Sequence, residues 1–237
     1  GKVHNAAGRP EAALAACNAV GVYFLLPESR TAQQRSEAGR HASVLQFFKK
    51  PHGRALAMIT ATYFFTTVAF SLLTATYALF TERRFGYNAS HNGYIFASQG
   101  VIGAVIQGAL MGWLVRFLSD KGLTIAGTVA LALSLVALPI SATEMALFLA
   151  TAGVAIGHAL VAAPLNGLAS KAVGPEAQGR VLGLMQSAAS LARITGPVLG
   201  GWLLGYDAVH MVAPFGQTPY WVGAGFMLVA VALATAL

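Results

Sequence analysis

The most unusual side chain in the sequence is an arginine inside an otherwise apolar stretch, SLARITGPVLGGWL at 190–203. A charged guanidinium in such a place must face protein or water and find a partner. No aspartate or glutamate lies within the long apolar segments of the chain. Arg193 could therefore pair with backbone carbonyls, with another part of the protein, or with an anionic group of a substrate. A purely structural arginine is the alternative.

Hydroxyl groups recur along one face of a predicted helix within residues 55–80. Spacings of three and four residues match the helical period. The face consists of Thr60, Tyr63, Thr67, Ser71 and Thr74. It would suit the wall of a polar substrate cavity. The same hydroxyls could instead bond to carbonyls of their own helix or to a neighbouring helix, which is common inside membranes.

Two amides flank a glycine on another predicted helix, with Gln99, Gly103 and Gln107 spaced four residues apart. An amide in hydrocarbon is costly unless it is partnered, so this face is expected to look inward. It could contact substrate or bond only to a neighbouring helix. We place Asn166, at the end of a later apolar segment, in the same predicted cavity. His158 could carry protons or simply pack.

The elements that carry these side chains are predicted by composition to be membrane helices. The 237 residues are 56% hydrophobic and only 10% charged, whereas soluble domains carry about 25% charged residues. Seven apolar segments stand out, at 12–27, 55–80, 93–115, 122–140, 145–165, 181–204 and 220–237. A bilayer core needs roughly 20 helical residues. Because these segments lack the alternation of a barrel strand, the sequence predicts an all-α membrane protein.

Basic residues lie between the apolar segments and predict the orientation. Connections on one side hold ten of them: Arg30, Arg35, Arg40, Lys49, Lys50, Arg54, Arg116, Lys121, Lys171 and Arg180. The positive-inside rule places this side in the cytoplasm. The formal net charge of +7 therefore indicates orientation rather than nucleic-acid binding.

The longest connection divides the chain. We expect 1–27 to be the end of an N-terminal half, 28–54 a cytoplasmic linker, and 55–237 a six-helix transmembrane domain. The chain does not start with Met, and we expect it to be a portion of a longer protein. No phosphate loop, clustered metal ligands or paired nucleophile and base is found in the sequence, so neither an enzyme nor a metal site is predicted.

Glycines and a proline predict close helix packing in the sixth segment. Gly196, Gly200 and Gly201 let a neighbouring helix approach, and Pro197 bends the chain. We expect this stretch to act as a pivot packed against the region of the second and third segments. The pairs Gly108 with Gly112 and Gly153 with Gly157 have the spacing of further close contacts.

Two stretches resemble the major facilitator superfamily, in particular its drug:proton antiporter branch, which includes tetracycline efflux proteins. They are GRVLGLMQSAASLARITGPVLGGWL at 179–203 and FLLPES at 24–29. The first is similar to the antiporter motif, with Gly183, Gly196–Pro197 and Gly200–Gly201 in place and Ala192 replacing a glycine. The resemblance implies twelve helices in two halves around a central cavity, of which this chain would hold helix six, the central loop and helices seven to twelve.

A third stretch, GWLVRFLSDKG at 112–122, resembles a degenerate copy of the family's gating motif. Gly112 matches its first glycine, and Arg116 stands where the motif has an aspartate. With Asp120 and Lys121 these residues form the predicted cytoplasmic gate loop. Gly103 and Leu131 stand where tetracycline pumps have a histidine and an aspartate, so this chain lacks those polar groups.

The resemblance implies a secondary active transporter, and we expect proton-coupled efflux of small amphipathic compounds by alternating access. The expected partners are a small-molecule substrate, the lipid bilayer and the N-terminal half of the same transporter. The proton gradient would replace any bound cofactor, with the coupling acid in the N-terminal half. A bacterial cytoplasmic (inner) membrane and a role in antibiotic resistance are expected. The alternatives are a metabolite importer or exporter, whose carboxylated substrate could use Arg193, and a non-transporting membrane binding module.

Overall fold

The computed structural model describes residues 15–24 and 53–237. Contacts divide the chain into two units, 1–43 and 44–237. In the first unit the structure describes a short apolar helix, Ala15–Phe24, and the rest of the predicted segment 12–27 lies outside the described residues. The predicted linker 28–54 also lies almost wholly outside them, so the domain limits at 27 and 54 stay a prediction.

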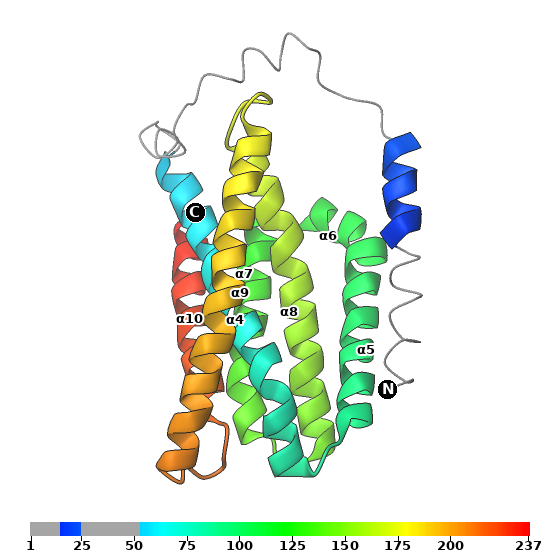
Figure 1. Ribbon diagram of the computed structural model, residues 1–237. Helices are drawn as coiled ribbons and strands as arrows, with labels where there is room; N and C mark the ends of the chain where they lie inside the picture. Colours follow the sequence, from blue (N-terminus) through cyan, green and yellow to red (C-terminus); the bar gives the residue numbers. More distant parts are fainter. Residues whose placement is uncertain (1–14, 25–52) are drawn as a thin grey trace. The chain divides into compact units, whose positions relative to one another are not determined.

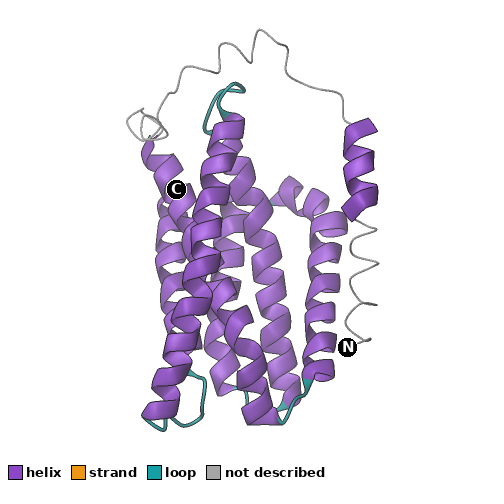
Figure 2. Cartoon of the chain, in the orientation of Figure 1, coloured by secondary structure: helices purple, strands orange, loops and turns teal. Residues whose placement is uncertain are grey.

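The second unit is a bundle of long helices (Figure 1). Its elements are α4 (Gly53–Phe85), α5 (Ala89–Val105), the π-helix η1 (Ile106–Leu110), α6 (Met111–Phe117), α7 (Asp120–Ile140), α8 (Glu144–Lys171), α9 (Gln178–Val209) and α10 (Thr218–Ala236). Because α5, η1 and α6 follow one another without a break, they form a single span, Ala89–Phe117. Figure 2 shows helices joined by short loops over the described residues, with no strand among them. The predicted all-α class is confirmed.

Five of these spans have the length and hydropathy to cross a membrane: α4, α5 to α6, α7, α8 and α10. Within the described second unit α9 is the exception. It is 32 residues long, which is ample for a crossing. Its hydropathy is lower because Arg193, several glycines and other polar residues interrupt the apolar run.

Three helices begin earlier than their apolar runs, each at a polar side chain that caps it. Asn88 accepts a hydrogen bond from the His91 backbone N–H at the start of α5. Ser119 and Thr143 cap α7 and α8 in the same way. Each cap satisfies a backbone donor that has no partner inside the helix. Hydropathy therefore located the middle of each helix and missed the polar first turns.

The helices run alternately up and down, which places the turns at two ends. Turns 86–88, 141–143 and 210–217 lie at one end, and turns 118–119 and 172–177 at the other (Figure 1). The second end carries Arg116, Lys121, Lys171 and Arg180. These are four of the ten basic residues that the sequence assigned to one side. That this side is cytoplasmic stays a prediction.

The core lies where α4 meets α9 and α10 and where α7 meets α8 and α10. Tyr77, Phe80 and Tyr220 are among its largest fully buried side chains. The Tyr77 hydroxyl lies 3.1 Å from Thr151 Oγ1 and so links α4 to α8. In contrast, α5 lies at the edge of the bundle opposite α10 (Figure 1), and only 6% of the most apolar stretch of the span Ala89–Phe117 is buried.

Close packing of α9 on α4 depends on two of the predicted glycines. A Cβ atom at Gly196 would lie 2.8 Å from the Leu72 backbone nitrogen, and one at Gly200 would lie 2.7 Å from Thr76 Cγ2. Such distances leave no room for a side chain. An added Cβ atom at Gly183 or Gly201 would meet no described atom within 4 Å, so the packing role of these two glycines stays a prediction. The pivot role of this stretch stays a prediction.

The two predicted glycine pairs also differ in whether a neighbouring helix lies close to them. Gly153 and Gly157 lie against α7, where a Cβ atom at Gly157 would come within 2.8 Å of Leu131. Gly108 and Gly112 meet no atom within 4 Å in the described residues. The predicted close contact is therefore present on α8 and absent from the described surroundings of η1 and α6.

Candidate substrate site

A cavity of about 400 Å³ lies between α4, α5, η1 and α8. Two of the predicted substrate residues, Gln99 and Gln107, line it, and we call it the amide pocket after them. Its described lining is Phe70, Phe96, Gln99, Gly100, Gly103, Ala104, Gln107, Ala155, His158 and Ala159. Small-molecule sites are typically concave, mostly apolar and fitted with a few polar groups. The amide pocket matches that description.

The two amides differ in their surroundings. Gln99 is 9% exposed, and its Nε2 atom is buried without a hydrogen-bond partner among the described residues. Gln107 is exposed and lies in η1, where the Met111 N–H donates to the Ile106 carbonyl five residues back. Single π turns inside α-helices are frequent at functional sites. The structure brings both amides to one cavity, while their contact with a substrate stays a prediction.

Aromatic rings close one side of the amide pocket. The rings of Phe70 and His158 are stacked, with centroids 4.0 Å apart and planes 18° from parallel. The ring centroid of Phe96, another lining residue, lies 5.5 Å from that of Tyr77. The stacking on Phe70 fits the packed alternative for His158.

The hydroxyl face of α4 mostly bonds to backbone carbonyls, which was the alternative to a cavity wall. Thr67 donates to the Tyr63 carbonyl at 2.7 Å, and Thr74 donates to the Ser71 carbonyl at 3.0 Å. Ser71 donates to the Arg193 carbonyl of α9 at 3.4 Å. The Tyr63 ring belongs to the apolar core. None of these residues lines the amide pocket, although helical spacing correctly placed them on one face.

Asn166 and Arg193 lie away from the amide pocket. Asn166 donates from Nδ2 to the Ala162 carbonyl at 2.9 Å, and its Oδ1 atom is buried without a partner in the described bundle. Arg193 is exposed on α9. The structure does not join these residues to Gln99 and Gln107 in one site. Their roles toward substrate remain predictions.

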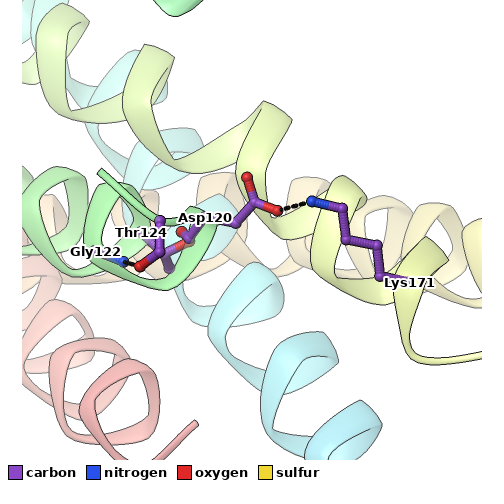
Figure 3. Close-up of polar contacts among 5 residues, drawn as sticks. Asp120, Gly122, Thr124 and Lys171 are labelled. Atoms are coloured by element: carbon purple, nitrogen blue, oxygen red, sulfur yellow. Dashed lines mark hydrogen bonds and ion pairs between the residues drawn. The ribbon is translucent and has the colours of Figure 1, made fainter. Parts of the chain in front are cut away.

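The predicted gate loop is tied to α8 by an ion pair. Asp120, at the start of α7, pairs with Lys171, at the end of α8 (Figure 3). Ser119 accepts from the Gly122 N–H beside them, and the Thr124 hydroxyl donates to the Asp120 carbonyl. Gly112 and Arg116 are exposed, and Lys121 is half-buried. Sequence reasoning counted Lys171 only among the basic residues that predict orientation and did not pair it with Asp120, although their opposite charges in connections on the same side were the available signal.

One buried acid was missed. The apolar run ends at 204, but α9 continues to Val209 and carries Asp207 into a fully buried position. Its carboxylate accepts hydrogen bonds from the backbone N–H of Thr218, at 3.1 Å, and from the Thr218 hydroxyl. Over residues 15–24 and 53–237, no three His, Cys, Asp or Glu side chains meet to form a candidate metal site.

Five helical spans of membrane length, with a pocket between some of them, define an integral membrane protein. Comparison with known proteins identifies its family. The profile of the Major Facilitator Superfamily matches residues 11–194 and 108–237. The chain belongs to this superfamily. The family and fold predicted from the sequence are confirmed.

Relatives include drug-resistance proteins at low identity. The chain is 27% identical over 195 residues to the class D tetracycline resistance protein of Salmonella ordonez, covering 79% of this chain and 47% of that protein. It is 26% identical over 224 residues to multidrug resistance protein 2 of Bacillus subtilis (strain 168), covering 92% of this chain and 54% of that protein. The chain thus spans about half the length of these relatives.

A solved structure shows a similar fold. The crystal structure of the human organic anion transporter MFSD10 (TETRAN) superposes with a TM-score of 0.63 at 23% identity. The match covers 76% of this chain and 40% of that one. Identity at this level supports the fold alone.

Proposed function

We propose that this chain forms part of a secondary active transporter that exports small amphipathic compounds in exchange for protons. The observation that carries the proposal is the amide pocket, which lies between membrane-length helices and is bordered by an amide without a partner among the described residues. The names of the tetracycline and multidrug resistance relatives support efflux. Their bacterial sources support placement in a bacterial cytoplasmic membrane.

Alternating access would expose such a pocket first to one side of the membrane and then to the other. The N-terminal half of the transporter is the proposed partner for this motion. The described lining of the amide pocket contains no carboxylate, and the carboxylate of Asp207 is engaged by Thr218. We therefore assign the proton-coupling acid to the N-terminal half.

The test is drug accumulation in cells that express the full-length protein. Cells with the protein should accumulate less of a fluorescent amphipathic drug than cells with an empty vector. A proton uncoupler should abolish the difference, because the gradient is the proposed energy source. Equal accumulation with and without the protein would refute efflux, and a difference that survives the uncoupler would refute proton coupling.

A further inference from the structure

We propose that the amide pocket takes an uncharged aromatic compound that carries a hydrogen-bond acceptor oxygen, and that Gln99 donates to this oxygen. The inference rests on the proposed transport function and adds to it the chemical class of the substrate. Three independent features of the described residues support it: the charge, the donor and the shape of the pocket.

The charge of the lining selects a neutral ligand. Apart from the titratable ring of His158, the described lining contains only apolar side chains, glycines and the two neutral amides. A cation or an anion brought out of water into such a site loses its hydration and meets no opposite charge among the described lining residues. Arg193, which could pair with an anion, does not line the pocket. An uncharged compound avoids this cost.

The donor selects a ligand with an acceptor. Gln99 is nine-tenths buried, and its Nε2 atom has no partner among the described residues. A buried donor left without a partner is unfavourable, whereas a carbonyl or ether oxygen of a ligand would satisfy it. Gln99 lines the same cavity in which that oxygen would lie, and rotation of its terminal amide about χ3 would turn the buried Nε2 atom toward that oxygen. Binding would therefore form a hydrogen bond that the described bundle lacks.

The shape selects a flat ring system. Phe70 and His158 present stacked rings, and aromatic pairs favour such offset arrangements with ring ligands as well. Small residues also line the pocket, among them Gly100 and Gly103 of α5, where an added Cβ atom would meet nothing within 4 Å. A cavity of about 400 Å³ lies near the lower end of the range for ligand pockets. A single aromatic ring or a pair of fused rings suits that volume.

The experiment measures equilibrium binding to the full-length protein purified in detergent, with tritiated N-methyl-2-quinolone as the probe. This compound is a neutral pair of fused rings with one carbonyl. Three analogues of similar size compete with it: the cation N-methylquinolinium, the anion quinoline-2-carboxylate, and 1-methylnaphthalene, which is neutral but has no acceptor. We expect the quinolone to bind most tightly and the two ions to compete about tenfold less well or worse.

Two variants test the assignment within the pocket. Gln99→Leu removes the donor and should weaken quinolone binding about tenfold while leaving 1-methylnaphthalene unaffected. Gly103→Leu places a large side chain in the pocket and should remove binding of both the quinolone and 1-methylnaphthalene. Gly225→Leu is the matched control, because Gly225 lies on α10 outside the pocket lining and also has open space around its Cβ position. This control should bind the quinolone like the unmodified protein.

Three outcomes would overturn the inference. They are ions that bind as well as the quinolone, an unchanged quinolone affinity in Gln99→Leu, and absence of saturable quinolone binding to the unmodified protein. The analogue series needs no variant, so a poorly folding variant cannot obscure the result. The assay uses no proton gradient. Failure of binding with drug efflux intact would reject the substrate class only, while binding without efflux would reject the proposed function.

Discussion

Asp207 connects the end of α9 to the start of α10 through a single buried carboxylate. The first residue of α10 is Thr218, and both its backbone N–H and its hydroxyl donate to this carboxylate. Gln217, at the N-cap position, makes no capping bond of its own. A negative charge at a helix N-terminus is favourable because it satisfies free N–H groups and opposes the positive end of the dipole. Asp207 thus caps α10 from another helix.

Replacement of Asp207 by alanine should therefore destabilise the protein. Loss of a charged cap and its hydrogen bonds is expected to lower the free energy of unfolding by about 1–3 kcal/mol. Thermal unfolding of the purified protein, followed by circular dichroism, would measure this. Glu82→Ala is the control, because Glu82 is an exposed acid at the same end of the bundle. Equal melting temperatures for the two variants would contradict the capping role.

At this scale, the sequence identified some site residues better than others. Gln99 was predictable because an amide within an apolar run needs a partner or a ligand. The hydroxyl face of α4 was found correctly, but spacing alone cannot distinguish a cavity wall from hydroxyls that bond to carbonyls of their own and a neighbouring helix. Asp207 was missed because it follows the apolar run, and only the continuation of α9 buries it.

Among the elements, α9 and α4 form the interface that depends most directly on glycine. Gly196→Ala would place a methyl group 2.7 Å from Ser71 Cβ and 2.8 Å from the Leu72 nitrogen. Because a backbone atom cannot move aside as a side chain can, the helices must separate. Overpacking of this kind costs about 1–3 kcal/mol, so we expect a lower melting temperature.

Gly201→Ala is the matched control on the same helix, because an added Cβ atom there meets nothing within 4 Å. It should be neutral or slightly stabilising, since alanine has the higher helix propensity by up to about 1 kcal/mol. If the two variants melt at the same temperature, the close contact of α9 with α4 is not what requires Gly196.

The extent of the helices was less predictable than their existence. Long apolar runs require helices in a bilayer, so the middles of the spans in the second unit followed from composition. Their ends did not, because Asn88, Ser119 and Thr143 cap them outside the apolar runs. The π turn Ile106–Leu110 was also not predicted. A change from an i+4 to an i+5 hydrogen bond leaves the apolar pattern almost unaltered.

For the bundle as a whole, the distribution of charge distinguishes the two ends. In the second unit, Arg54 and the residues Arg116, Lys121, Lys171 and Arg180 lie at one end. The other end has Arg83 and Arg84, and protein groups hold both. Arg83 lies 4.2 Å from the centre of the Phe215 ring, and Arg84 donates to the Pro139 carbonyl. The basic residues with a role in orientation therefore belong to the end that carries Lys171 and Arg180.

This asymmetry predicts the orientation in the membrane, because basic connections stay in the cytoplasm. The test uses the full-length protein in intact cells, with Cys17 changed to serine and single cysteines introduced by Ala142→Cys or Glu176→Cys. Both positions are exposed, in turns at opposite ends of the bundle. A membrane-impermeant maleimide should label the cysteine at 142 in intact cells and the cysteine at 176 only after permeabilisation. The reverse pattern would invert the orientation and place the ion pair of Asp120 with Lys171 outside the cell.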